Sequence, residues 1–123
     1  MPPLGAMSPA DFLRDHWQKH PLVVRAAFPG FVSPLDGDEL AGLACDPDIE
    51  SRIVVTEPGP RYALREGPFT ADDFADPPGH PWTLLVQDVD KHLPEFARWL
   101  EPFAFLPEWR LEDLMISWAS DGG

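Results

Sequence analysis

Asp113-Leu-Met-Ile-Ser-Trp-Ala-Ser-Asp-Gly-Gly123 closes the sequence and is the stretch that most constrains the fold. Its alternation predicts a strand over 114–119 whose two faces differ. One face carries Leu114, Ile116 and Trp118, and the other carries Met115, Ser117 and Ala119. The Asp-Gly-Gly that follows is typical of a turn leading to another strand. Large apolar residues on one face and a lone hydroxyl on the other indicate a sheet that lines a pocket. The residues that complete this pocket are expected outside these 123.

Short helices and strands alternate along the rest of the chain, and its 16 Pro and nine Gly disfavour long elements. Helices are expected to begin at Ser8-Pro9, Ser33-Pro34, Thr70 and Pro94, with the first ending before Pro21. Strands are expected at 22–25, 52–56, 61–65 and 82–87. A hairpin across Glu57-Pro-Gly-Pro60 joins the second and third of these, and strand 82–87 is the expected neighbour of the final strand.

These elements predict an α+β fold in which residues 1–123 form a single unit. A chain of this length buries roughly two-thirds of its unfolded surface, enough for a real core. A hydrophobic content of 44%, with five Trp and eight Phe, argues against disorder. The single cysteine, Cys45, lies in a small apolar stretch and is interpreted as a buried packing residue.

The net charge of −12 argues against direct binding of a nucleic-acid backbone. It favours encounter with a basic protein by electrostatic steering, although acidity that serves solubility explains it equally well. No apolar run approaches the roughly 20 residues that span a bilayer, and the N-terminus lacks a basic-then-apolar signal peptide. We therefore expect no membrane partner and a cytoplasmic location.

Candidate metal ligands within the chain are sparse. His16 and His20 have the spacing of two ligands on one helix face, but Pro21 follows directly and no third ligand is near. Asp88-Val-Asp90-Lys-His92 contains Asp-x-His, the reverse of an iron-binding His-x-Asp. Solvation and helix-dipole roles account for both groups, so the residues alone predict no catalytic or metal-binding set.

Several segments nevertheless resemble one family in order and at natural spacing over nearly the whole chain. They are Phe12-Leu-Arg-Asp-His-Trp-Gln-Lys-His-Pro-Leu-Val-Val-Arg25, Asp38-Glu-Leu-Ala-Gly-Leu-Ala44, Ser51-Arg52, Gly67-Pro-Phe69, Trp82-Thr-Leu-Leu-Val-Gln87, Pro107-Glu-Trp-Arg110 and Asp113-Leu-Met-Ile-Ser117. This pattern resembles the opening of the bacterial JmjC-type ribosomal oxygenases. The resemblance implies a cupin, or double-stranded β-helix, core and an Fe(II)- and 2-oxoglutarate-dependent hydroxylase. The best-known bacterial members hydroxylate an arginine of a large-subunit ribosomal protein, and a basic substrate suits the charge of −12.

The resemblance also implies which parts of the site lie here. Residues 1–123 correspond to the N-terminal portion of a JmjC cupin domain, with the core cut after strand 114–119. The iron-binding His-x-Asp, the later histidine and the basic residue that pairs with 2-oxoglutarate are expected beyond Gly123. Ser117 occupies the position whose hydroxyl is expected to bind 2-oxoglutarate, although a small residue tolerated on an inner face explains it too. Met115 lies on the same face as Ser117, where it either lines the 2-oxoglutarate pocket or is only a packing residue.

Two hypotheses follow. The first is that the chain is the N-terminal part of an oxygenase. In that case the chain is inactive by itself, because the metal ligands are absent from it. The second is a non-catalytic acidic protein-binding module derived from such an enzyme. Family dimerisation relies mainly on regions after the cupin core, so the resemblance leaves the oligomeric state open.

Overall fold

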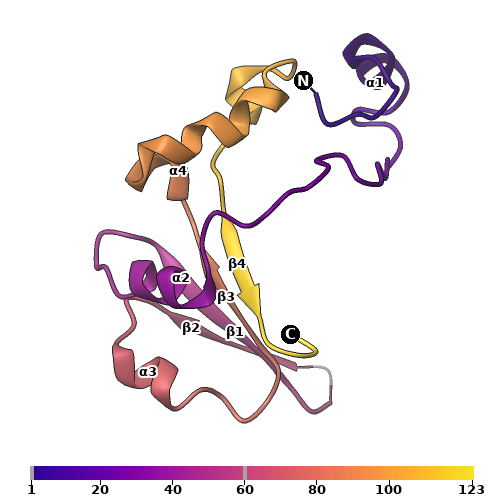
Figure 1. The fold of residues 1–123 in the computed structure, drawn as a ribbon. Helices are drawn as coiled ribbons and strands as arrows, with labels where there is room; N and C mark the ends of the chain where they lie inside the picture. Colours follow the sequence, from indigo (N-terminus) through magenta and orange to yellow (C-terminus); the bar gives the residue numbers. More distant parts are fainter. Residues whose placement is uncertain (1, 60) are drawn as a thin grey trace. The chain divides into compact units, whose positions relative to one another are not determined.

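The computed structural model describes residues 2–59 and 61–123 of the chain (Figure 1). These residues group into two compact units. The sheet unit comprises residues 34–97 and 113–123, and the aromatic unit comprises residues 2–33 and 98–112. The expectation that residues 1–123 form a single unit stays a prediction. No helix among the described residues is both long and apolar enough to cross a membrane.

A four-stranded antiparallel sheet forms the centre of the sheet unit, in the order β2-β1-β3-β4. Its strands are β1 (Ser51–Glu57), β2 (Arg61–Glu66), β3 (Trp82–Val86) and β4 (Ile116–Ala119). The predicted hairpin and the pairing of strand 82–87 with the final strand are both confirmed. Pro60 of the predicted hairpin turn lies outside the described residues. The α+β class predicted from the sequence is confirmed.

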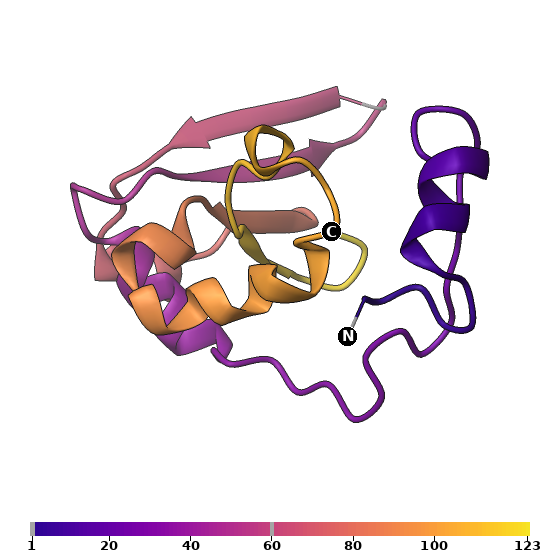
Figure 2. The same cartoon turned by 90° about the horizontal axis from the view of Figure 1, so that it is seen from above.

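One face of the sheet packs against helix α2 (Gly37–Ala44), as Figures 1 and 2 show. Alternate residues of the central strands point to this covered face and are almost completely buried: Ile53, Val55, Leu84 and Val86. Leu40 and Ala44 of α2 are buried with them. Each large side chain of this core contributes roughly 1.5–3 kcal/mol to folding.

Helix α2 begins three residues later than the predicted start at Ser33-Pro34. Its N-cap is Asp36, whose carboxylate accepts the Glu39 N–H at 2.8 Å, while the Glu39 carboxylate accepts the Asp36 N–H at 3.2 Å. This reciprocal capping satisfies two donors that the helix cannot satisfy itself and therefore fixes the start. Cys45, predicted to be buried, is only half-buried at the helix end.

Three further helices belong wholly or partly to the sheet unit. They are α3 (Ala71–Ala75), α4 (Val89–His92) and the 3₁₀ helix η1 (Pro94–Phe103), which ends in the aromatic unit. The predicted helix start at Thr70 is confirmed: its backbone N–H donates to the Asp73 carboxylate at 2.7 Å. The start at Pro94 is confirmed as well.

The aromatic unit contains helix α1 (Pro9–Asp15) and the 3₁₀ helix η2 (Glu108–Arg110). Ser8 caps α1 as predicted, since its hydroxyl oxygen accepts the Asp11 N–H at 3.1 Å. The helix ends at Asp15, well before Pro21, and beyond its C-cap His16 the residue Gln18 adopts a left-handed conformation with φ of 61°. Edge-to-face ring pairs stabilise the unit: Phe12 with Phe105, and Phe31 with Trp99.

The predicted strand at 22–25 is wrong. Residues 21–24 form no regular element in the structure, and Val23 is 74% exposed. A β-branched run becomes a strand only where a partner strand supplies its hydrogen bonds. All four strands of the sheet pair with one another, and none of them pairs with this segment.

Candidate functional site

Ser117 lies in β4 on the face of the sheet opposite α2, which we call the open face. The pairing register places Ser117 beside Leu85 of β3 and Leu85 beside Arg52 of β1. Ser117 itself is exposed, and its hydroxyl makes no hydrogen bond within the described residues. The predicted division of the final strand is therefore confirmed: Ile116 and Trp118 pair with the buried residues Val86 and Leu84, whereas Ser117 faces outward.

The open face combines apolar surface with one fixed positive charge. Tyr62 and Leu64 of β2 are 72% and 57% exposed on it. Arg52 is half-buried, and its guanidinium donates to the Gln87 side-chain oxygen at 2.6 Å. A charged donor with an amide acceptor makes a strong hydrogen bond, which holds the guanidinium beside the sheet. The sequence showed Arg52 only as part of a family string, and strand alternation was the signal that could have placed it on this face.

A set of long-range hydrogen bonds, which we call the aspartate clasp, fixes the chain just before β4. The Leu114 N–H donates to Asp90 Oδ1 at 2.8 Å, and the Asp88 N–H donates to Asp113 Oδ2 at 3.0 Å. The Val89 N–H donates to the Leu114 carbonyl at 3.0 Å. Because both backbone groups of Leu114 are engaged with 89–90, β4 begins at Ile116 and not at the predicted position 114. The clasp sets where Ser117 enters the sheet.

The clasp also explains the Asp-x-Asp-Lys-His segment that was weighed as a metal site. Asp90 holds a backbone N–H, and the Asp88 carboxylate accepts from the Lys91 ammonium at 2.5 Å. That hydrogen bond raises the pKa of Lys91 above its ordinary value. Asp88 adopts a left-handed backbone with φ of 54°, which aspartate tolerates better than most residues. These roles are structural.

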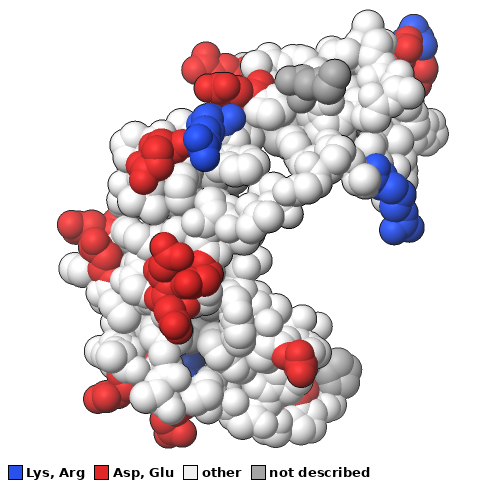
Figure 3. Space-filling model, viewed as in Figure 1, with Lys and Arg blue, Asp and Glu red and all other residues white. Residues whose placement is uncertain are grey.

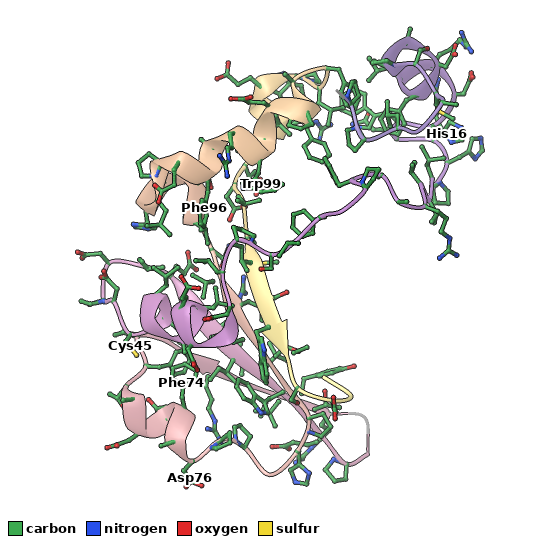
Figure 4. All side chains as sticks on the ribbon, in the orientation of Figure 1. His16, Cys45, Phe74, Asp76, Phe96 and Trp99 are labelled. Carbon is green, nitrogen blue, oxygen red and sulfur yellow. The ribbon has the colours of Figure 1, made fainter. Side chains whose placement is uncertain are left out.

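The two histidines at helical spacing lie in the aromatic unit, where Figure 4 labels His16. His16 caps the end of α1 and stacks on Phe12 with ring centroids 6.4 Å apart. His20 follows α1 in a non-helical segment and is exposed. Among the described residues, no three His, Cys, Asp or Glu side chains come together in a group that could hold a metal ion.

The turn after β4 forms as predicted. The Gly123 N–H donates to the Ser120 carbonyl at 2.8 Å, and Gly122 has φ of 79°, a conformation that glycine adopts without strain. Ser120 also ties this turn to β3, because its hydroxyl oxygen accepts the Trp82 N–H at 3.0 Å. Both ends of β4 are thus anchored to the β3 region, which fixes the orientation of Ser117.

In sequence and in structure this chain is similar to part of the ribosomal oxygenases. The structure of the Escherichia coli ribosomal oxygenase YcfD matches with a TM-score of 0.79 at 40% identity, over 91% of this chain and 30% of that one. The same E. coli protein in complex with cobalt and 2-oxoglutarate matches with a TM-score of 0.80 at 39% identity. The resemblance to bacterial JmjC-type ribosomal oxygenases is confirmed.

Two named relatives match along the sequence. The ribosomal protein uL16 3-hydroxylase of E. coli is 42% identical over 113 residues, which is 92% of this chain and 30% of the relative. A probable ribosomal oxygenase of Haemophilus influenzae is 34% identical over 117 residues, or 95% of this chain and 29% of the relative. The chain therefore spans about 30% of the length of the relatives it matches. No protein-family model matches it.

Proposed function

We propose that this chain forms part of the cosubstrate-binding side of an Fe(II)- and 2-oxoglutarate-dependent dioxygenase. In this proposal the whole enzyme hydroxylates an arginine of a large-subunit ribosomal protein and works in the cytoplasm. The observation that carries the proposal is the homology to the E. coli uL16 3-hydroxylase over 92% of this chain. The E. coli structures with cobalt and either 2-oxoglutarate or succinic acid support a metal and a dicarboxylate as ligands of the whole enzyme.

Ser117 is the residue of this chain that we assign to 2-oxoglutarate. Its exposed hydroxyl, without a partner among the described residues, lies on the open face and is free to donate to a carboxylate. Such a hydrogen bond is worth roughly 1.5–3 kcal/mol. Even millimolar affinity needs about 4.1 kcal/mol, so Ser117 orients the cosubstrate and does not hold it alone. When bound, 2-oxoglutarate supplies the reducing equivalents for hydroxylation.

In this proposal Ser117 contributes to the cosubstrate site, and the metal ligands come from another part of the enzyme. Non-haem iron of this class takes two imidazoles and one carboxylate on one side, leaving positions for cosubstrate and oxygen. No group of three metal-binding side chains occurs among the described residues. We propose that the isolated chain is inactive and that the open face completes its site together with the metal-bearing part of the enzyme.

The charge of the chain supports a basic protein substrate. Figure 3 shows Asp and Glu side chains spread over the visible face of the sheet unit, with few Lys or Arg. At a net charge of −12, the chain would attract a basic ribosomal protein and raise its rate of encounter. This steering is a long-range effect and is weakened by salt.

The same charge supports a second candidate, a non-catalytic acidic module that binds a basic protein. The two candidates differ in whether they require 2-oxoglutarate bound at the open face. A binding module would engage the ribosomal protein without 2-oxoglutarate, whereas the oxygenase would modify it only in the presence of 2-oxoglutarate.

A chimera separates them: this chain replaces the matching 30% of the E. coli 3-hydroxylase, and uL16 is incubated with Fe(II) and 2-oxoglutarate. We expect mass spectrometry to show the gain of one oxygen atom on uL16, dependent on 2-oxoglutarate. A folded chimera that binds uL16 but leaves it unmodified would favour the binding module. Calorimetry of the isolated chain is expected to show no micromolar binding of Fe(II) or 2-oxoglutarate, and such binding would refute its proposed inactivity.

A further inference from the structure

A hollow lies on the α2 side of the sheet, on the face opposite Ser117. It has a volume of about 460 Å³, within the usual range for ligand sites. Three aromatic side chains line it: Trp82 of β3, Trp118 of β4 and Phe74 of α3, the last labelled in Figure 4. Asp36 and Asp38 line it as well. We call this site the tryptophan pocket.

The pocket is preformed by close packing. The Trp82 and Trp118 rings lie 5.0 Å apart between centroids, inclined at 45°. The indole of Trp118 packs on the first turn of α2, where a Cβ added at Gly37 would lie only 3.1 Å from Trp118 Nε1. Glycine at position 37 therefore lets the ring approach the helix closely. These contacts fix the ring without closing the pocket.

Trp118 is much more exposed to solvent than its neighbour on the same face of the sheet. Its neighbour across the strand pair, Leu84, is 2% exposed on the same face, whereas Trp118 is 41% exposed. An exposed indole face carries the negative part of the ring's quadrupole and attracts a cation. A tryptophan in this setting is suited to contact a ligand as well as to fill the core.

The charged groups around the rings determine whether the pocket favours a positively or a negatively charged ligand. Asp36 uses Oδ1 to cap α2, and Asp38 is exposed with no partner among the described residues. Among the residues that the structure describes, no Lys or Arg lines the pocket. The N-terminus of α2 adds only about half a positive charge, which two carboxylates outweigh. The pocket therefore favours a cation and disfavours an anion.

We infer that the tryptophan pocket binds an arginine side chain of a basic partner protein. A guanidinium is planar and weakly hydrated, so it stacks on indole and also donates to carboxylates, which an ammonium does less well. The net charge of −12 complements a partner rich in such side chains. The inference does not depend on the proposed function, because the pocket and Ser117 lie on opposite faces of the sheet and no cosubstrate is involved.

The test titrates the chain with an acetylated Gly-Arg-Gly amide and with the same peptide carrying citrulline, a neutral shape-match of arginine. Indole N–H signals of Trp82 and Trp118 in ¹H–¹⁵N spectra report binding at the pocket. We expect saturable shifts with the arginine peptide, at a Kd on the order of millimolar. The citrulline peptide is expected to bind roughly 3- to 30-fold more weakly. Equal binding of the two peptides, or no saturable shift with arginine, would overturn the inference.

Two variants in the pocket and one control outside it locate the site. Asp38→Asn is expected to weaken binding of the arginine peptide roughly 2- to 5-fold, whereas Asp48→Asn, at an exposed acid outside the pocket, is expected to leave it unchanged. Trp118→Leu keeps an apolar side chain but removes the ring and is expected to abolish measurable binding. An equal loss in the Asp38 and Asp48 variants would show that only overall charge attracts the peptide, contrary to a built site.

Discussion

Replacing Asp90 tests whether the aspartate clasp fixes the strand that carries Ser117. Asp90→Ala removes the acceptor of the Leu114 N–H, a charge-assisted hydrogen bond of 2.8 Å between half-buried groups. Hydrogen bonds to charged groups contribute roughly 1.5–3 kcal/mol. Partial exposure places this one near the lower end, so we expect the free energy of unfolding to fall by about 1.5–2 kcal/mol.

Urea unfolding followed by tryptophan fluorescence measures this loss. With a slope of about 2 kcal/mol per molar urea, the midpoint is expected to fall by roughly 0.7–1 M. Asp90→Asn is the matched control, since its amide oxygen can still accept the Leu114 N–H, and it is expected to lose less than half as much. If Asp90→Ala unfolded at the same midpoint as the unsubstituted chain, the clasp would not hold β4, and the reasoning would be refuted.

Three further predictions concern the sheet unit. Leu84→Ala on the covered face is expected to cost about 3 kcal/mol of unfolding free energy, and Leu85→Ala on the open face less than half of that; equal losses in urea titrations would contradict the assignment of faces. Gly67→Ala is expected to cost roughly 1–3 kcal/mol, because the new Cβ would lie 2.2 Å from Ser51 Oγ. Adding Ser51→Ala should recover part of that cost in thermal melts, and a further loss would be evidence against the clash. Because β4 is an edge strand that pairs only with β3 among the described residues, the chain is expected to self-associate in sedimentation velocity as its concentration rises; a single monomeric species throughout would be the contrary result.

Features set by neighbouring residues were predictable from the sequence. The caps at Ser8 and Thr70, the hairpin of β1 and β2, and the turn after β4 each depend on side chains within a few positions. The pairing of β3 with β4 spans a longer stretch, but the strand predicted at 82–87 was the expected neighbour of the final strand. The alternation of the final strand separated Ser117 from Ile116 and Trp118, as observed.

Features set by contacts between distant residues were not predictable in this way. Segment 22–25 has strand-forming residues but no partner strand in the sheet. The aspartate clasp joins residues 24 and 25 positions apart through backbone donors, which leave no pattern in the sequence. The start of α2 is an exception, since it depends on a local pattern: the prediction at Ser33-Pro34 missed the reciprocal cap of Asp36 with Glu39 that determines it. The tryptophan pocket likewise requires α2, α3, β3 and β4 to be folded together.

The most direct test of the central claim is the KM for 2-oxoglutarate of the chimera with Ser117→Ala. A hydrogen bond from Ser117 to the cosubstrate predicts a KM at least about 10-fold higher than that of the unsubstituted chimera. Ser117→Thr, which keeps the hydroxyl, is expected to have a KM close to that of the unsubstituted chimera. An unchanged KM in Ser117→Ala would contradict the assignment of the open face to the cosubstrate.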